Sequence, residues 1–403
     1  MNEAAAARSA PGPLRVMRVL TRPNLGGPTR QAIALWHALA AHSVRTLLVT
    51  GAVADGETLL SPAAHGVPEL TLEEAVAAGR EAVGWVVVPE LGRRLAPFAD
   101  RRTVVTLRTL MAALRPEVVH THTSKAGWLG RTAARRAGVA RIVHTFHGHV
   151  LQDYFARPVG WLLARLERHL ATRTHVLCAV SGSCADELAA AGVAARDRFV
   201  IVPPAVPLPA LRSPGEARVA LGIATAERRI VCVGRLVPIK RVAHFVHMLA
   251  ALPGVHGDIV GDGPERPALV TLAAKVAPGR VHFRGAVPTI AGDLAAYDAL
   301  VLPSVREGCP LVAIEAFAAG VPVVGYDVPG VRDALAELGR GLLVPTAAGP
   351  RGLAAALDTL WRTTGAVADA VAGGRRAVAR CAPAAVAAQL SALYRDPLER
   401  APR

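Results

Sequence analysis

The feature that most constrains this chain is a regular alternation of β-branched runs with runs rich in alanine and leucine. The first half contains LRVMRVL (14–20), TRQAIALWHALAAH and VRTLLVT (44–50), and the same order continues through THVLCAV (174–180) to RFVIVP (198–203). Runs of the first kind predict buried strands, and runs of the second kind predict helices. Because strands and helices alternate, we predict an α/β fold with parallel sheets covered by helices on both faces.

A proline-dense segment, PPAVPLPALRSPG at 203–215, interrupts this alternation. It lacks apolar periodicity, as is typical of a linker between domains. Beyond it the alternation restarts with RRIVCVG (228–234). We therefore predict two doubly wound, Rossmann-like domains over 1–203 and 204–376, followed by a final helix and tail over 377–403. Domains of this kind bind ligands at the carboxyl ends of their strands, so we expect a binding cleft between them.

Composition limits the class of protein. Of 403 residues, 52% are hydrophobic and 19% are charged, which favours packed cores over disorder. Gly, Pro, Arg or Glu cut every apolar run before the ~20 residues that a membrane-spanning helix needs. The opening MNEAAAARSAPGP lacks the pattern of a signal peptide, so we expect a short flexible tail and a cytoplasmic protein. The cysteines have no CxxC spacing and are expected to be buried thiols; they are Cys178, Cys184, Cys232, Cys309 and Cys381.

The chain carries a large positive charge. Lys and Arg number 46 against 31 Asp and Glu, a formal net charge of +15. This excess favours an anionic partner such as nucleic acid, anionic lipid or a nucleotide-type ligand. Aromatic residues are only 4% of the chain, and the basic residues are dispersed along predicted helices. A stacking platform or recognition helix is therefore not indicated, and we expect no nucleic-acid partner.

Two groups of residues in the predicted N-terminal domain lie where strands end. Gly26 and Gly27 follow the first strand, where a bare backbone would let a phosphate approach a helix N-terminus. The spacing is not GxGxxG, so a tight turn is the competing interpretation. Histidines follow two later strands; they are His120, His122, His144, His147 and His149. A metal site is one interpretation, but no acidic residue or helical HxxxH completes a ligand set, which favours sugar or phosphate recognition.

The predicted C-terminal domain has a cationic and an acidic pair. Arg235 and Lys240 lie in VGRLVPIK between a strand and a helix, where they would neutralise a diphosphate or remain solvated surface charges. Glu307 is expected in a turn and Glu315 in the helix that starts near Cys309 or Pro310, partly buried. A buried carboxylate would bind ribose or sugar hydroxyls; an acid–base pair of a hydrolase and a structural salt bridge are the alternatives.

Together these stretches resemble the family 4 retaining glycosyltransferases, which have the two-domain GT-B fold. The resemblance rests on GRLVPIK, on EGCPLVAIEAFAAGVPVV with its two glutamates eight residues apart, and on LTRPNLGGPTRQAIALWHAL. HTHTSKAGWLGRTAARRAGVARIVHTFHGHV is similar to a subgroup found in bacterial polysaccharide gene sets. The resemblance covers nearly the whole chain.

The resemblance implies roles for individual residues. Arg235 and Lys240 would contact the donor diphosphate, and Glu315 would hold the ribose hydroxyls. Glu307 would lie against the transferred sugar and His147 beside it, which makes these two, with Arg235 and Lys240, the expected catalytic residues. The remaining donor-site residues are expected to be Gly26, Gly27, Gly308, Cys309, Pro310 and Leu311, with Arg284 to Pro288 around the nucleobase. His122 and Lys125 are assigned to the acceptor or sugar side.

The resemblance also implies a mechanism and partners. The donor would be a nucleotide sugar, UDP-linked by preference with GDP-mannose as a second choice, and the acceptor a glycan or lipid-linked glycan of the cell surface. The anomeric configuration would be retained, the leaving phosphate would take the acceptor proton, and no metal or other cofactor would be required. The last helix would cross back to the N-terminal domain, and basic helices such as RTAARRAG would contact the inner face of the plasma membrane.

One departure from the family and several alternatives accompany this hypothesis. Where the family has proline, asparagine and glycine at the entry to the second domain, this chain has Pro203, Pro204 and Ala205, which predicts a stiffer hinge. A glycosyltransferase of secondary metabolism and a UDP-sugar epimerase on the same fold are alternative functions. A non-catalytic binding protein that uses only the basic surface is the alternative from another class.

Overall fold

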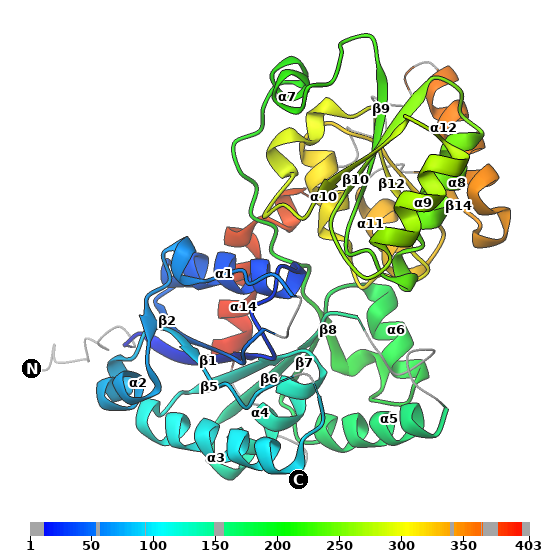
Figure 1. The fold of residues 1–403 in the computed structure, drawn as a ribbon. Helices are drawn as coiled ribbons and strands as arrows, with labels where there is room; N and C mark the ends of the chain where they lie inside the picture. The colour runs from blue at the N-terminus through cyan, green and yellow to red at the C-terminus, as the bar shows by residue number, and fades with distance from the viewer. Residues whose placement is uncertain are drawn as a thin grey trace, which may run out of the picture. The chain divides into compact units, whose positions relative to one another are not determined.

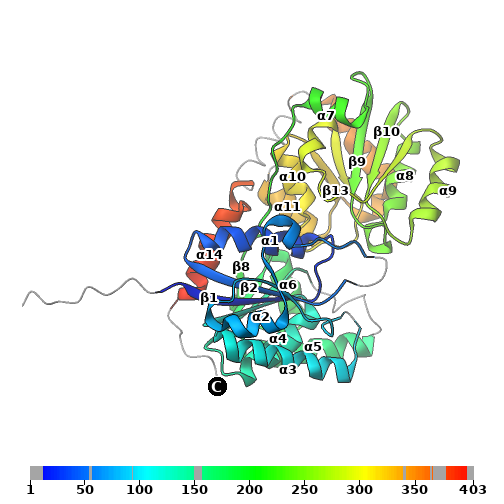
Figure 2. The same cartoon turned by 60° about the vertical axis from the view of Figure 1, so that its left-hand side comes forward.

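The computed structural model describes residues 12–53, 57–92, 94–148, 157–338, 342–363, 365 and 378–396. Most of the opening segment, up to residue 11, and His149 lie outside the described residues. The chain divides into two compact units, drawn in Figures 1 and 2. The first unit groups residues up to Ala179, Leu188–Val202 and the residues from Pro383 onward; the second groups Val180–Glu187 and Pro203–Ala382.

The described part of the first unit is built on a parallel sheet of eight strands in the order β3-β4-β2-β1-β5-β6-β7-β8. Strands β1 and β2 are buried along almost their whole length, as expected for strands covered on both faces. The strands are β1 Leu14–Leu20, β2 Val44–Thr50, β3 Glu69–Leu70, β4 Gly84–Val87, β5 Val118–His122, β6 Arg141–Phe146, β7 Val176–Ala179 and β8 Phe199–Ile201.

Helices cover both faces of this sheet. Figures 1 and 2 show α1 and α14 on one face and α3, α4 and α5 on the other. The helices are α1 Gly27–Ala40, α2 Leu72–Ala78, α3 Pro97–Leu114, α4 Ser124–Arg136, α5 Arg157–Ala171 and α14 Pro383–Arg395, with α6 Gly182–Ala190 divided between the units and short 3-10 turns at Ala63–His65, Gly79–Glu81 and Arg196–Arg198. The final helix therefore belongs to the N-terminal unit, as the resemblance implied.

Side chains fasten α14 to the first unit. Arg395 donates a hydrogen bond to the carbonyl of His42 at 2.8 Å, and Arg141 donates one to the carbonyl of Leu393 at 2.6 Å. The ring of His120 on β5 bonds the hydroxyl of Tyr394 at 2.6 Å. Last-turn carbonyls lack partners within their own helix, so the bond from Arg141 also satisfies the end of α14.

Helix α4 lies unusually close to the sheet because two of its residues have no side chain. A Cβ atom on Gly127 would lie 2.5 Å from Cε1 of His144, and one on Gly130 would lie 2.6 Å from Cγ2 of Thr121. Two buried ion pairs connect the same helix to its neighbours. Lys125 pairs with Asp100 of α3 and Arg131 pairs with Glu167 of α5, each at 2.6 Å.

The described part of the second unit contains a parallel sheet of six strands in the order β11-β10-β9-β12-β13-β14. The strands are β9 Arg228–Val233, β10 Val255–Val260, β11 Val281–Gly285, β12 Ala299–Leu302, β13 Val323–Tyr326 and β14 Leu342–Val344. The helices are α7 Pro214–Leu221, α8 Val242–Ala250, α9 Arg266–Val276, α10 Leu311–Ala318, α11 Pro329–Leu338 and α12 Gly349–Arg362, with 3-10 turns η4 Pro238–Lys240, η5 Ala291–Ala296 and η6 Thr346–Ala348. Residues 203–213 form no helix or strand.

No helix within the described residues has the length and apolar character needed to cross a membrane.

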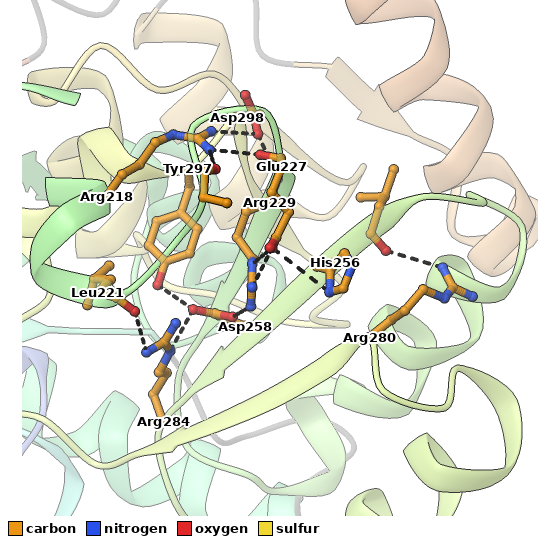
Figure 3. A network of polar contacts seen from close by, with 12 residues as sticks. Arg218, Leu221, Glu227, Arg229, His256, Asp258, Arg280, Arg284, Tyr297 and Asp298 are labelled. Carbon is orange, nitrogen blue, oxygen red and sulfur yellow. Dashed lines mark hydrogen bonds and ion pairs between the residues drawn. The ribbon is translucent and has the colours of Figure 1, made fainter. Parts of the chain in front are cut away.

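A charged network replaces apolar packing on part of the second sheet (Figure 3). Asp258, on β10 and fully buried, accepts hydrogen bonds from Arg229 at 2.6 Å and from Arg284 at 2.7 Å. The hydroxyl of Tyr297 donates to the same carboxylate at 2.8 Å. Burial and the Asp258 charge raise the pKa of Tyr297, so its hydroxyl stays protonated and continues to donate. Arg218 of α7 extends the network by pairing with Asp298 at 3.1 Å.

Replacement of Asp258 tests how much this network stabilises the second unit. Asp258→Ala removes the buried carboxylate that Arg229 and the half-buried Arg284 share, and Arg229 keeps only its pair with Glu227, so we expect the free energy of unfolding to fall by about 3 kcal/mol. Asp358→Ala is the matched control, because Asp358 forms an exposed pair with Arg362 on α12 and its loss should change stability by less than about 0.5 kcal/mol. Urea unfolding measures both variants, and equal shifts would contradict the assignment.

Candidate functional site

The first group of candidate residues lies where the strand order of the second unit reverses. The chain passes from β9 to β10 and β11 on one side, whereas β12, β13 and β14 lie on the other. In a doubly wound sheet, this switch point between β9 and β12 is the usual place for a ligand. Arg235 and Lys240 follow β9, and Glu307 follows β12, so the predicted residues belong to the two loops that flank this point.

Lys240 and Glu307 are in direct contact. The ammonium Nζ of Lys240 lies 2.5 Å from Oε1 of Glu307, and the hydroxyl of Ser304 donates to the same oxygen at 2.7 Å. The Lys240 and Glu307 side chains keep 24% and 11% of their surface exposed, so the pair reaches solvent. Ser304 was not predicted, because nothing in its local sequence distinguishes it from other loop serines.

Backbone packing between two loops places Lys240. The amide of Gly234 donates to the carbonyl of Val260 at 2.9 Å, and a Cβ atom on Gly261 would lie 1.9 Å from the Gly234 oxygen. Gly234 itself has φ of 153°, which favours glycine, and the Lys240 stem lies 3.6 Å from where its Cβ would be. The glycine at 261 therefore lets the two loops approach each other, and the Lys240 stem packs directly against the backbone of Gly234.

Arg235 differs from Lys240. Its side chain is exposed, and among the described residues it makes no hydrogen bond or ion pair. The structure thus places one of the two predicted cations against a carboxylate and leaves the other open to solvent.

The turn that carries Glu307 is held from two sides. The hydroxyl of Ser181 donates to the carbonyl of Gly308 at 3.0 Å. A Cβ atom on Gly330, at the start of α11, would lie 2.1 Å from the oxygen of Glu307 and 2.7 Å from that of Gly308. Gly330 and Ser181 were also missed by sequence reasoning, because both act through contacts distant in sequence.

The rest of the predicted donor segment is more deeply buried than expected. Helix α10 begins at Leu311, one or two residues later than predicted, and Pro310 and Leu311 are buried while Cys309 is half-buried. Glu315, expected to be partly buried, is only 1% exposed. A carboxylate at that depth needs hydrogen-bond donors around it.

The side chain of Arg284 makes contacts that the sequence did not predict. It was expected, with the residues through Pro288, to surround the nucleobase. Its guanidinium instead bonds the buried Asp258 and, at 3.0 Å, the carbonyl of Leu221 (Figure 3). A side chain held by these two acceptors is part of the charged network of the second unit.

In the first unit, the glycine loop leads into an uncapped helix. Helix α1 begins at Gly27, slightly before the predicted start, and its N-cap Gly26 supplies no side chain to the first-turn amides. A Cβ atom on Gly26 would meet only Asn24, at 3.5 Å, and its φ of −160° suits any residue. Backbone strain therefore does not explain this glycine; no side chain caps the first turn, where Gly27 and Thr29 have amide N–H groups that could bind an anion and Pro28 has none.

Three of the four described histidines of the predicted group, His120, His122 and His147, form one cluster on the sheet face that α14 covers, whereas His144 lies on the opposite face, under α4. Nδ1 of His122 lies 3.0 Å from Nε2 of His147, and Arg18 on β1 lies 3.1 Å from Nε2 of His122. His120 is bonded to Tyr394 and Thr145, and His144 lies 2.8 Å from the hydroxyl of Thr121. Within the described ranges, no three His, Cys, Asp or Glu side chains are arranged to hold a metal ion.

The electrostatic environment keeps these histidines neutral. Burial, reinforced by the positive charge of Arg18, holds the pKa values of His120 and His122 well below their usual range. Burial and the charge of Arg131 do the same to the pKa of His144. For His147, burial and then Arg18 lower the pKa to about 4. At neutral pH the cluster therefore consists of uncharged hydrogen-bonding rings.

Two further assignments are corrected by burial. Lys125, predicted on the acceptor or sugar side, keeps only 7% of its side chain exposed and pairs with Asp100. His122 is also buried, so it reaches a ligand only through His147. Arg131 of the RTAARRAG helix lies in its ion pair with Glu167, so of the three arginines of that stretch only Arg135 and Arg136 are exposed.

Comparison with known proteins agrees with this geometry. Residues 25–208 match the profile of Glycosyltransferase Family 4, and residues 227–363 match that of Glycosyl transferases group 1. The chain is 30% identical to an Escherichia coli UDP-Gal:alpha-D-GlcNAc-diphosphoundecaprenol alpha-1,3-galactosyltransferase over 60% of this chain and 66% of that protein. It is 31% identical to a Streptomyces fradiae 2-deoxystreptamine N-acetyl-D-glucosaminyltransferase over 71% of this chain and 70% of that protein. The crystal structure of Anabaena HepE with UDP and glucose has a similar fold, with a TM-score of 0.72 and 19% identity over 94% of this chain and 99% of that one.

The depressed pKa values predict sensitivity to acid. The unfolded chain binds protons on histidine below about pH 6.5, whereas His147 in the folded protein does so only near pH 4. The free energy of unfolding should therefore fall as the pH drops from 6.5 to 4, by about 3 kcal/mol for His147 alone. Urea unfolding at several pH values measures the slope. His147→Asn should flatten it, His65→Asn, which removes an exposed ring, should not, and an unchanged slope in the first variant would contradict the burial.

Proposed function

The chain belongs to the group 1 and family 4 glycosyltransferases, and on this premise we propose that it moves a sugar from a nucleotide sugar, UDP-linked in preference to GDP-mannose, to a glycan or lipid-linked glycan acceptor. The observation that carries the proposal is the contact of Lys240 with Glu307 at the switch point of the second unit. In a nucleotide-sugar donor, the cation would bind the anionic diphosphate and the carboxylate would accept hydrogen bonds from the hydroxyl groups of the sugar.

Lys240 acts on the leaving group. Breaking the bond between the sugar and the phosphate develops negative charge on the diphosphate, and Lys240 stabilises that charge more in the transition state than in the ground state. The exposed Arg235 is free to close on the diphosphate as a second cation. Because two side chains supply this positive charge, the proposed reaction requires no metal or other cofactor, and chelation by EDTA should leave it unchanged.

Two carboxylates recognise hydroxyl groups. Glu315, in the second turn of α10, accepts hydrogen bonds from the ribose diol of the nucleotide. Glu307, held in place by Ser304 and Lys240, accepts from the transferred sugar. In the first unit, His147 is the residue that we propose as a hydrogen-bond partner of a sugar.

The proposed transfer retains the configuration at the anomeric carbon. The bond from that carbon to the phosphate oxygen breaks while a bond to the acceptor oxygen forms on the same face, and the acceptor proton passes to the leaving phosphate. Electrons and atoms balance without a protein nucleophile. The residues described above then serve to orient the donor and stabilise charge.

Relatives support the choice of substrates. The name of the Escherichia coli relative specifies a UDP-linked donor and a diphosphoundecaprenol acceptor, which favours cell-surface polysaccharide synthesis at the cytoplasmic side of the membrane. The Streptomyces relative acts on 2-deoxystreptamine, which favours glycosylation of a secondary metabolite as the second candidate. A UDP-sugar epimerase would convert the donor with no acceptor present, and product analysis of that reaction separates it from both.

Binding of nucleotides is the direct test of the donor site. We expect one of UDP, GDP, ADP or TDP to raise the melting temperature strongly, because a ligand that binds only the folded state stabilises it. Lys240→Met and Glu315→Gln should each remove most of the shift. Lys275→Met is the control, because Lys275 is an exposed lysine of α9. A protein that no nucleotide stabilises, or whose shift survives both site variants, would contradict the proposal.

We also propose that the outer faces of α3 and α5 bind an anionic lipid surface. Phe98 and Trp161 are 84% and 65% exposed, and Val105 and Leu162 accompany them. Exposed arginines at helical spacing lie beside these apolar side chains; they are Arg101, Arg102, Arg108, Arg165 and Arg168. The single acidic residue of each helix is buried in an ion pair with α4, so both outer faces are apolar and positive. Aromatic and basic side chains together suit the headgroup region of an anionic bilayer.

Sedimentation with lipid vesicles tests this surface. The protein should sediment with phosphatidylglycerol vesicles but not with phosphatidylcholine vesicles, and binding should weaken with salt. The double variant Phe98→Ser with Trp161→Ser should lose most of the binding. Val219→Ser, which removes an exposed apolar side chain from α7, should bind like the unmodified protein. Equal binding by both variants would overturn the assignment.

A further inference from the structure

A chain of nitrogen-to-nitrogen hydrogen bonds crosses the first unit from Arg18 on β1, through His122 on β5, to His147 after β6. The first link joins the Arg18 guanidinium to Nε2 of His122 at 3.1 Å. The second joins Nδ1 of His122 to Nε2 of His147 at 3.0 Å. In each link one nitrogen must donate and the other accept, so the position of every proton along the chain follows once one direction is fixed.

Arg18 fixes that direction. A guanidinium carries only donors, so Nε2 of His122 has to be the acceptor and holds no proton. The single proton of neutral His122 is then on Nδ1, which donates to Nε2 of His147. Nε2 of His147 is therefore also without a proton, and the proton of this ring is on Nδ1.

We propose that Arg18 is a positioning residue that fixes His147 in its Nδ1-protonated tautomer, so that His147 presents a hydrogen-bond donor to an oxygen of the bound sugar. The inference rests on the proposed function for the identity of that oxygen. His147 is then a donor in the reaction, and it does not act as a base.

The burial of Arg18 supports this role. Its side chain is only 1% exposed, and no carboxylate in the described part of the chain pairs with it. Apart from His122, its contact is with the carbonyl of Ala32 at 3.3 Å. A buried guanidinium without a carboxylate is unfavourable for stability, which favours a functional reason for the residue.

The environment of His147, at the end of the hydrogen-bond chain, also supports this role. Nδ1 of His147 is buried, and no described residue accepts a hydrogen bond from it. A buried N–H without an acceptor is unfavourable, and an oxygen of a ligand would restore the missing bond. The ring as a whole is half-buried, which leaves it within reach of a bound molecule.

The groups around the hydrogen-bond chain keep its two histidines, His122 and His147, neutral. Those that face it are Arg18 on β1, His120 on β5 at a ring distance of 4.2 Å from His122, and Tyr394 on α14, while His144 acts on it from the opposite face of the sheet. None is an acid, and burial with the Arg18 charge lowers the pKa of His147 to about 4. A second proton on His147 would have to occupy Nε2 and would break its bond with His122.

Nitrogen NMR of the unmodified protein, with labelled histidine, tests the tautomers without any ligand. We expect His122 and His147 to carry their protons on Nδ1 at pH 7, with the His147 signals identified from the His147→Asn variant. Protonation of His147 at Nε2, or at both nitrogens, would overturn the proposal. This result does not depend on whether the protein binds a nucleotide sugar.

A double-mutant cycle then tests the contribution of Arg18 to sugar recognition. The measured quantity is the affinity for UDP-galactose, UDP-glucose or UDP-N-acetylglucosamine, whichever binds best, divided by the affinity for UDP. Arg18→Met should lower this ratio by about tenfold, the loss of one hydrogen bond to the sugar, whereas Arg18→Lys, which also only donates, should retain most of it. In the His147→Asn background the same change should have little effect, because an amide N–H needs no tautomer to be set.

The cycle separates a positioning role from a structural one. An equal loss from Arg18→Met in both backgrounds would mean that Arg18 acts only through stability, and would overturn the proposal. If Arg18→Met does not fold, Arg18→Lys and the spectra of the unmodified protein still decide the question. An unmodified protein that binds none of these nucleotide sugars contradicts the proposed function, whereas the tautomers are decided by the spectra alone.

Discussion

The geometry of both units depends on one constraint, the parallel arrangement of their strands. Because parallel strands end at the same edge of a sheet, loops far apart in sequence meet there, and the reversal of strand order opens a place between two of them. In the second unit this reversal brings Lys240 and Glu307 together. In the first unit it lies between β1 and β5, the strands that carry Arg18 and His122. The same arrangement therefore brings a charged pair together in the second unit, and a series of hydrogen bonds from Arg18 through His122 to His147 in the first.

The sequence predicted what depends on neighbours along the chain. Alternating strand and helix patterns gave the fold class, and the loops after β9 and β12 were located because each follows a short apolar run. Residues that act over long separations were not predicted. Gly330 is needed because a Cβ atom there would meet the Glu307 turn, and Arg18 acts through rings on β5 and after β6. Such contacts leave no periodic signal in the sequence.

Charged residues were the least predictable. Arg284 and Lys125 both stand in motifs that resemble functional segments, yet each is neutralised by a buried carboxylate, Asp258 and Asp100 respectively. A sequence gives the sign of a side chain but not the partner that folding brings to it. On α3 and α5, the buried ion pairs have the opposite effect on the surface. Their acidic residues point inward to α4, so the exposed face of each helix is more positive than its composition indicates.

The last helix has a consequence for the order in which the protein is made. Tyr394 contacts His120, which lies 274 positions earlier in the sequence, and α14 packs against α1 and the start of β6. During synthesis the ribosome delivers the whole second unit before it delivers this helix, although domains commonly fold as they emerge. The N-terminal sheet must therefore wait, with α1 and His120 uncovered, until α14 has left the exit tunnel. A nascent chain of this protein is a natural client for chaperones that shield apolar surface late in translation.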